Sequence, residues 1–367
     1  MQIKVLVVDD TIFYRKLLSD MLKALPEVQV VGTANNGKIA LSRIRSLKPD
    51  LVTLDVEMPE MNGLQVLQTI LDEGLQTKCL LVSSLTEKGG EITVQALQLG
   101  ALDFITKPQA QNAEENKQLL QKSLAPKIRS FIQQKRLWKQ PPGGKVREAR
   151  PARPARPSQD LEEILARSKD LEKRTEKSQA VAIGVSTGGP NALAKFLPAL
   201  SLDLNVPVFV VQHMPAIFTA SLARSLDPKC PMQVKEAENG EQVRPNTIYI
   251  APGGQQMKVA GVGQFQDKVI RITDDPPENN CKPSVDYLLR SVAREYGSKG
   301  TAVIMTGMGQ DGKLGAKVLK ASGGVCIVQD EASSVVFGMP KSVIDAGLSD
   351  MVVPLQQLPQ EISRTVL

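Results

Sequence analysis

The sequence predicts an α/β protein, with a flavodoxin-like domain followed by a second doubly wound parallel-sheet domain. Short apolar segments alternate with helical patterns over residues 1–125, and similar segments recur over residues 179–367. The stretch between them is basic and rich in proline. Repeated alternation of strands and helices implies parallel sheets that helices cover on both faces. A length of 367 residues also fits two domains, because a domain takes roughly 150 residues.

The first domain contains five apolar segments that are typical of strands. We expect these strands at residues 4–8, 28–33, 51–54, 79–83 and 103–106. We expect helices near residues 15–25, 38–46, 63–71 and 91–99, and after Glu114. Five alternating strands within about 125 residues favour a flavodoxin-like sheet.

Polar side chains stand at the ends of these predicted strands. The set comprises Asp9, Asp10, Asp55, Ser83 or its neighbour Ser84, and Lys107. Clustered carboxylates repel one another, so such a site needs a cation, and oxygen ligands suit Mg²⁺. A hard metal beside a free carboxylate is arranged for phosphoryl transfer to that carboxylate. The lysine and the serine hydroxyl would then stabilise the phosphoryl oxygens.

Residues 126–178 are expected to form a linker. Between Lys127 and Pro157 there are ten lysines and arginines, and Glu148 is the single acidic residue. The repeat over 149–157 has proline at every third position, which favours an extended, semi-rigid chain. Residues 160–177 fit a short amphipathic helix. A solvated basic tether accounts for the charge, so we expect no nucleic-acid partner, although binding of nucleic acid is the alternative.

Three apolar strands of the second domain, residues 179–367, end in a serine, a histidine and an aspartate. These residues are Ser186, His213 and Asp311, and His213 is the only histidine in the chain. Sites in parallel α/β sheets lie at the carboxyl ends of strands, so the three side chains are expected to meet. A serine hydroxyl needs a neighbouring base, and the imidazole needs an acidic partner. The pattern therefore predicts nucleophilic hydrolysis, for which no cofactor is expected.

The surroundings of Ser186 support this interpretation. The step of 27 residues from Ser186 to His213 fits one strand–helix–strand unit, which would place the two on neighbouring strands. Gly188 and Gly189 permit a sharp turn and offer backbone amides to an oxyanion, and the amide of Met308 is a further candidate. The chain order of serine, histidine and acid differs from the order in α/β-hydrolases, despite a matching glycine–serine–glycine pattern.

Composition favours a cytoplasmic protein that does not span a membrane. Residues 1–10 lack the layout of a signal peptide. No apolar stretch approaches the roughly 18 residues that a membrane span needs. The four cysteines, Cys79, Cys230, Cys281 and Cys326, are scattered without metal-ligand spacing. We expect them to be reduced core thiols.

The first domain resembles the receiver domain of two-component response regulators. The matching segments are residues 7–10, 54–59 and 104–108, and the resemblance covers roughly residues 1–125. It implies that Asp55 accepts phosphate from a histidine kinase, and that Asp9 and Asp10 hold Mg²⁺ together with Asp55. It also implies that Ser83 is the switch hydroxyl and that Phe104 is the aromatic residue that moves with it.

The second domain resembles the catalytic domain of the chemotaxis protein-glutamate methylesterases. The matching segments are residues 183–189, 212–214, 249–253, 282–286, 306–312 and 336–340. The resemblance implies that Ser186, His213 and Asp311 are nucleophile, base and acid. It implies glutamyl methyl esters of chemoreceptors as substrates, and deamidation of receptor glutamines by the same route. Val185 stands where the family has alanine, a difference that does not affect the chemistry.

Two other functions fit part of the sequence. A phosphate-accepting domain followed by a basic linker could belong to a DNA-binding regulator, but the second half shows no compact helix-turn-helix. The other alternative is a hydrolase that acts on an ester outside the chemoreceptors. The expected partners remain a chemotaxis histidine kinase and methyl-accepting chemoreceptors.

Overall fold

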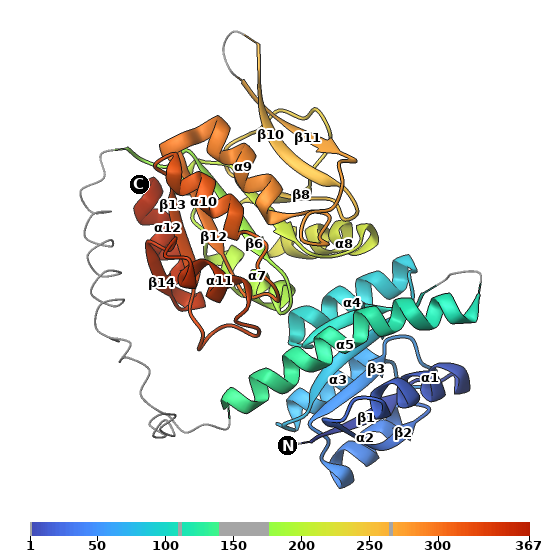
Figure 1. The fold of residues 1–367 in the computed structure, drawn as a ribbon. Coiled ribbons are helices and arrows are strands. Elements are labelled where there is room, and N and C mark those ends of the chain that lie inside the picture. Colours follow the sequence, from blue (N-terminus) through green and yellow to red (C-terminus); the bar gives the residue numbers. More distant parts are fainter. Residues whose placement is uncertain (1, 109–111, 139–175, 264–266) are drawn as a thin grey trace, which may run out of the picture. The chain divides into compact units, whose positions relative to one another are not determined.

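The computed structural model describes residues 2–108, 112–138, 176–263 and 267–367. The chain divides at Gln133 into two compact units, and each unit has a parallel sheet of its own (Figure 1). Among the described helices, none is both long enough and apolar enough to cross a membrane.

The N-terminal unit contains a five-stranded parallel sheet with the strand order β2-β1-β3-β4-β5. Its strands are β1 (Ile3–Val8), β2 (Val28–Ala34), β3 (Leu51–Asp55), β4 (Lys78–Ser83) and β5 (Asp103–Thr106). Its helices are α1 (Ile12–Lys23), α2 (Gly37–Leu47), α3 (Gly63–Asp72), α4 (Glu87–Leu99) and α5 (Ala113–Trp138). The predicted flavodoxin-like order is confirmed, and each predicted strand is found to within one residue at either end.

Two local features position the site of this unit. The strand order changes direction between β1 and β3, and a crevice for ligands lies at the carboxyl ends of such strands. The side chains of Asn36, Asn62 and Thr86 accept backbone N–H groups in the first turns of α2, α3 and α4. Such capping fixes where a helix begins.

Helix α5 is longer than the sequence predicted. It continues through Pro126 to Trp138, so residues 126–138 of the expected linker are helical. Five buried apolar residues recur at helical spacing along it: Leu120, Leu124, Ile128, Phe131 and Ile132. Their burial outweighs the cost of the proline, and Lys127 pairs with Asp103 at 2.5 Å instead of adding to a free basic tether. The rest of the linker through residue 175, with most of the helix expected at 160–177, lies outside the described residues.

The C-terminal unit contains a seven-stranded parallel sheet with the order β14-β13-β12-β6-β7-β9-β8. Its strands are β6 (Ala180–Val185), β7 (Val208–Gln212), β8 (Gln233–Glu236), β9 (Thr247–Ile250), β12 (Gly300–Ile304), β13 (Val325–Gln329) and β14 (Met351–Val353). Its helices are α7 (Gly189–Phe196), α8 (Ala216–Leu226), α9 (Val285–Tyr296), α10 (Lys313–Ala321), α11 (Met339–Asp345) and α12 (Leu358–Val366).

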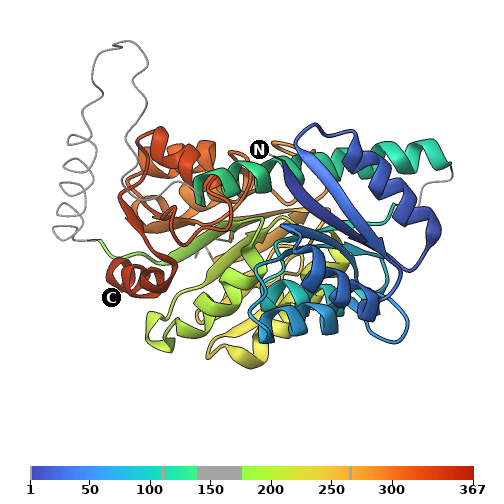
Figure 2. The same ribbon diagram turned by 90° about the horizontal axis from the view of Figure 1, so that it is seen from below.

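Burial explains why these segments form a central sheet. Every residue of β6, β7, β12 and β13 is buried, which is the pattern of parallel strands covered on both faces. Helices lie on both sides of the sheet (Figures 1 and 2). The predicted doubly wound sheet is confirmed. An antiparallel ribbon of β10 (Gln256–Val262) and β11 (Asp267–Thr273) is an addition that the sequence analysis did not predict.

Candidate active site

Ser186 and His213 lie at the ends of two neighbouring strands. Strands β6 and β7 pair in parallel, with Val185 opposite Gln212, and each of the two candidate residues directly follows its strand. The backbone N–H of His213 donates to the carbonyl of Val185 at 3.2 Å. The sheet therefore places the serine and the histidine side by side, as the spacing of 27 residues predicted.

Asp311 reaches the histidine from the loop after β12. Its Oδ2 lies 2.8 Å from His213 Nε2, and the side chain is only 2% exposed. The carboxylate also accepts hydrogen bonds from the Ser284 hydroxyl, from the Asn279 side-chain amide, and from the backbone N–H groups of Val285, Asp286 and Gly312. Burial alone would raise the pKa of Asp311, but His213 and these donors hold it below its usual value. The aspartate is therefore ionised and fixed.

The pairing with Asp311 assigns different tasks to the two ring nitrogens of His213. Nε2 carries the proton that is donated to Asp311 Oδ2, so Nδ1 has the free lone pair of the neutral ring. Burial alone would lower the pKa of His213, but the bond to Asp311 and the adjacent Cys281 raise it to about 9. The Sγ atom of Cys281 lies 3.6 Å from Nδ1. Nδ1 is therefore the nitrogen that can take a proton from Ser186.

A tight turn presents Ser186 at the start of α7. The Gly189 N–H donates to the Ser186 carbonyl at 2.8 Å, and the Ser186 N–H donates to Thr306 at 3.0 Å. Gly188 has a φ of +79°, and a Cβ atom there would lie 2.5 Å from Val335, so only glycine fits. Within the described chain the Ser186 hydroxyl makes no hydrogen bond to His213. Such bonds often tighten only when substrate is bound.

The candidate oxyanion donors differ in their availability. The Gly189 N–H is committed to the turn, which argues against it as a donor to substrate. In the described residues the N–H groups of Gly188 and Met308 have no acceptor, so both remain candidates. Gly307, which precedes Met308, packs against the serine: a Cβ atom on Gly307 would lie 2.8 Å from Ser186 Cβ. The backbone of Met308 is therefore near the serine.

The loop between β11 and α9 supplies residues that the sequence analysis missed. Asn279 and Ser284 bind Asp311. Ser284 lies in the segment 282–286 that resembles the methylesterase family, but neither residue was assigned a role, and no signal marked Asn279. Cys281 was expected to be a core thiol, and this is wrong, because it is partly exposed and contacts His213. Cys230 is also only partly buried, whereas Cys79 and Cys326 are buried as expected.

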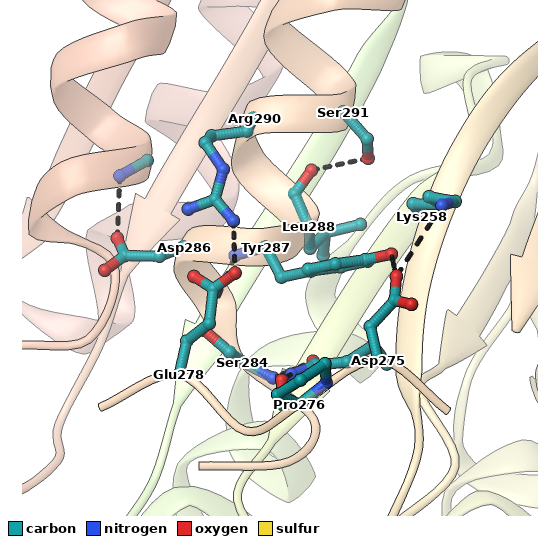
Figure 3. A network of polar contacts seen from close by, with 12 residues as sticks. Lys258, Asp275, Pro276, Glu278, Ser284, Asp286, Tyr287, Leu288, Arg290 and Ser291 are labelled. Carbon is teal, nitrogen blue, oxygen red and sulfur yellow. Dashed lines mark hydrogen bonds and ion pairs between the residues drawn. The ribbon is translucent and has the colours of Figure 1, made fainter. Parts of the chain in front are cut away.

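Polar contacts fasten this loop to α9, as Figure 3 shows. Tyr287 donates its hydroxyl to Asp275, and the Arg290 guanidinium binds Glu278. Asp286, at the start of α9, accepts the N–H of Gly315 at 2.6 Å, and so connects α9 to α10. The first turn of α9 donates two N–H groups to Asp311. It is therefore fixed by contacts with the preceding loop and with α10.

The predicted carboxylate cluster also forms in the N-terminal unit. Oxygen atoms of Asp9, Asp10 and Asp55 lie within 4.8 Å of one another. Lys107 Nζ lies 2.9 Å from Asp9 Oδ2 and 2.7 Å from Asp55 Oδ2. Burial raises the pKa of Asp55 to about 7, with Asp9 adding to the rise and Lys107 opposing it. Burial therefore disfavours the ionised form of Asp55, and a bound cation would favour it.

The predicted switch residues Ser83 and Phe104 belong to β4 and β5 of the same sheet. Ser83 is buried at the end of β4, and its Oγ accepts a hydrogen bond from Thr93 Oγ1 at 2.7 Å. The neighbouring Ser84 is partly exposed. Phe104 is buried in β5 with 7% of its surface exposed. The carbonyl of Ser83 accepts the backbone N–H of Lys107 at 2.8 Å, so Ser83 lies next to a residue of the cluster, while its role in switching remains a prediction.

The two sites define a class of protein. One unit is a parallel-sheet hydrolase in which serine, histidine and aspartate lie together, and the other has a carboxylate cluster of the kind that accepts phosphate. Comparison with known proteins agrees with this class. The CheB methylesterase family matches residues 181–362, and the response regulator receiver domain matches residues 5–118.

Relatives extend the similarity to the whole chain. A protein-glutamate methylesterase/protein-glutamine glutaminase of Desulfotalea psychrophila is 49% identical over 99% of this chain and 98% of its own length. The protein of that name from Bacillus subtilis is 41% identical over 99% and 98%. The crystal structure of the Thermotoga maritima CheB methylesterase catalytic domain has 43% identity and a TM-score of 0.49, covering 51% of this chain and 98% of that one. The chain belongs to the protein-glutamate methylesterase/protein-glutamine glutaminase family.

Proposed function

We propose that this protein is a phosphorylation-regulated serine hydrolase of the cytoplasm that demethylates glutamyl methyl esters on chemoreceptors and deamidates their glutamines. The observation that carries the proposal is the alignment of Ser186 and His213 on adjacent strands, with His213 Nε2 2.8 Å from Asp311. Membership of the family supplies the class of substrate. A chemotaxis histidine kinase is the proposed phosphodonor.

The first half of the reaction acylates the serine. His213 Nδ1 takes the hydroxyl proton of Ser186, and the serine oxygen attacks the ester carbonyl. The negative charge that develops on the carbonyl oxygen is stabilised by the backbone N–H groups of Gly188 and Met308. Asp311 stabilises the resulting imidazolium through Nε2–H. The imidazolium then gives its proton to the leaving group, which departs as methanol from an ester or as ammonia from a glutamine.

The second half releases the glutamate. His213 Nδ1 takes a proton from water, which attacks the glutamyl–serine ester. The same proton returns to Ser186 as the ester breaks. Both half-reactions need Nδ1 to be unprotonated when attack begins, and both need the first turn of α9 to keep Asp311 in place.

Methanol release from methylated chemoreceptor membranes tests this proposal. We expect release by the full chain, a higher rate after addition of a small-molecule phosphodonor, and none with Ser186→Ala. Ser201→Ala, an exposed serine at the start of a short 3₁₀ turn, is the matched control and should retain activity. Hydrolysis of simple esters without methanol release from receptors would instead indicate a hydrolase with another ester substrate.

For the N-terminal unit we propose Asp55 as the phosphate acceptor and Mg²⁺ as its cofactor. Donor chemistry supports the fit, since the three clustered side chains are all carboxylates, the ligands that Mg²⁺ prefers. Asp9 Oδ2 is buried and accepts no well-directed hydrogen bond within the described chain, although Lys107 lies near it. When bound, Mg²⁺ would neutralise charge on the phosphoryl oxygens. Lys107 orients the Asp55 carboxylate and binds a phosphoryl oxygen.

Phosphate uptake from acetyl phosphate tests the assignment. We expect labelling of the full chain only when Mg²⁺ is present, because three carboxylates cannot hold a phosphoryl dianion without a cation. Asp55→Asn should abolish labelling, whereas Asp72→Asn, which changes an exposed acid at the end of α3, should not. Full labelling in excess chelator would contradict the metal assignment.

A further inference from the structure

We propose that Cys281 Sγ and His213 Nδ1 form a binding site for a thiophilic divalent cation, Zn²⁺ being the metal that fits best. The bound ion would inhibit the hydrolase by occupying the nitrogen that serves as the base. The inhibitory part rests on the proposed function, whereas the binding part rests on the geometry alone.

The separation of the two ligand atoms fits a shared zinc ion. Sγ and Nδ1 are 3.6 Å apart. Zinc–sulfur bonds of about 2.3 Å and zinc–nitrogen bonds of about 2.0–2.1 Å at a tetrahedral angle place sulfur and nitrogen roughly 3.5–3.6 Å apart. The two atoms therefore need almost no movement to bind one ion.

The opposite edge of the imidazole has the partner that a metal-binding histidine requires. Such a histidine donates its other ring N–H to a carboxylate or carbonyl, which fixes the tautomer and raises the basicity of the ligand nitrogen. Asp311 accepts from Nε2 at 2.8 Å. The tautomer that Asp311 imposes leaves the lone pair of Nδ1 on the side of Cys281.

Asp311 itself acts here as an outer partner and not as a ligand. One atom each from His213, Cys281 and Asp311 lie within 4.8 Å of one another. However, the carboxylate already accepts hydrogen bonds from Ser284 and from three backbone N–H groups in addition to the histidine. The ion would have two protein ligands and complete its shell with water. Such a site suits a reversible inhibitor better than a structural metal.

The loop holds Cys281 rigidly enough to act as a ligand. Asn279 and Asn280 both have positive φ values, of 51° and 61°, which asparagine tolerates better than most residues. They form a two-residue turn in which Glu278 and Cys281 exchange backbone hydrogen bonds of 3.0 and 2.7 Å. The guanidinium of Arg290 on α9 donates a hydrogen bond to the Glu278 carboxylate (Figure 3). The thiol is thus positioned by the same network that positions the aspartate.

The two cation sites of the chain would select different metals. The cluster of Asp9, Asp10 and Asp55 offers only oxygen atoms and suits a hard ion such as Mg²⁺. Cys281 and His213 offer sulfur and nitrogen, which suit zinc. Excess Mg²⁺ should therefore fill the first site and leave the second open to a thiophilic ion.

Cobalt binding tests the site without any assay of activity. Co²⁺ is added to the full chain in excess Mg²⁺, and the near-ultraviolet absorption of a thiolate–cobalt bond is recorded. We expect the band in the wild type and in Cys230→Ser, a control at another partly buried thiol. We expect no band in Cys281→Ser, with competition by Zn²⁺ in the wild type. A band of equal strength in Cys281→Ser, or its loss in Cys230→Ser, would overturn the proposal.

Zinc inhibition tests the consequence for catalysis. Each variant is compared with its own rate in the absence of zinc. We expect Cys281→Ser to need at least roughly tenfold more Zn²⁺ for half-inhibition, since even outer-shell losses weaken metal sites about tenfold or more. A chelator should restore the wild-type rate. Unchanged sensitivity of Cys281→Ser would refute the inhibitory site while leaving the hydrolase intact. An absence of hydrolysis in the untreated wild type would instead refute the proposed function, and the cobalt band would still decide the metal site.

Discussion

His213 takes part in every step of the proposed hydrolysis. One ring nitrogen is fixed by Asp311 at 2.8 Å, and the other faces Cys281 at 3.6 Å. Because the chain has no other histidine, no second imidazole can replace it as a base. The loss of any member of such a relay should therefore disable the relay as a unit.

Substitution of the relay residues provides the first prediction at this scale. We expect Ser186→Ala and His213→Ala each to reduce methanol release by roughly 10⁴-fold or more, and Asp311→Asn to reduce it less. The double variant of Ser186 and His213 should be little worse than either single variant, since the two residues act together. Losses that add on the logarithmic scale would rule out the relay. Circular dichroism checks that each variant is folded.

The pH dependence of the reaction is a second prediction. The pKa of His213 is raised to about 9 by Asp311 and Cys281, which face its two nitrogens. Attack needs the neutral ring, so kcat/KM should rise roughly tenfold per pH unit until about pH 9 and then level off. Cys281→Ala removes one cause of the rise, so its profile should level off at a lower pH. Measurements in the presence of a chelator exclude bound metal, and a wild-type plateau near neutral pH would contradict the prediction.

At the scale of elements, strand ends were the part of the site that the sequence could predict. Ser186 and His213 directly follow buried strands of one sheet, and Asp55 ends a buried strand of the other. Within each parallel sheet the carboxyl ends of neighbouring strands lie together. The loop over residues 274–284 could not be predicted in this way, because its residues bind through local turns and contacts with α9 that carry no periodic signal. For the same reason Cys281 looked like a scattered thiol. Helix α5 continues past the predicted start of the linker because burial of its apolar side chains outweighs the cost of Pro126 inside the helix.

Close packing of β6 against α9 leads to the element-scale prediction. A Cβ atom on Gly184 of β6 would lie 2.3 Å from Val285 Cγ1, and Val285 donates its N–H to Asp311 at 2.7 Å. We expect Gly184→Ala to lower the free energy of unfolding by about 1–3 kcal/mol through overpacking. It should also reduce kcat because α9 is displaced from Asp311. Urea unfolding and methanol release measure the two effects.

Gly261 of β10 provides the matched control for this strand glycine. A Cβ atom there would lie 3.0 Å from Glu295 Oε2, the end of a flexible side chain that can move aside. Gly261→Ala should therefore change the free energy of unfolding by no more than about 0.5 kcal/mol. Equal effects of the two substitutions would show that the contact between β6 and α9 is not the cause.

At the scale of the whole molecule, the phosphate site and the hydrolytic site belong to different compact units. Each unit has its own sheet, and the C-terminal unit has its own cluster of buried apolar residues. A phosphorylation signal at Asp55 can affect hydrolysis at Ser186 only if the two units influence each other. Such an influence needs contacts that differ between the phosphorylated and unphosphorylated states.

We expect the unphosphorylated N-terminal unit to restrain the hydrolase. Phosphate on Asp55 would draw the Ser83 hydroxyl toward the phosphoryl oxygens and repack the already buried Phe104. The surface of this unit would then change and release the restraint, as in other switches driven by local charge. A fragment that begins near Gln179 should then be more active than the unphosphorylated full chain. A phosphodonor should raise the rate of the full chain alone, and not the rate of its Asp55→Asn variant. Equal receptor demethylation by the fragment and the unphosphorylated full chain would reject inhibition. In that case the N-terminal unit would act by recruiting substrate, because phosphorylation could then raise the rate only through binding to the receptor.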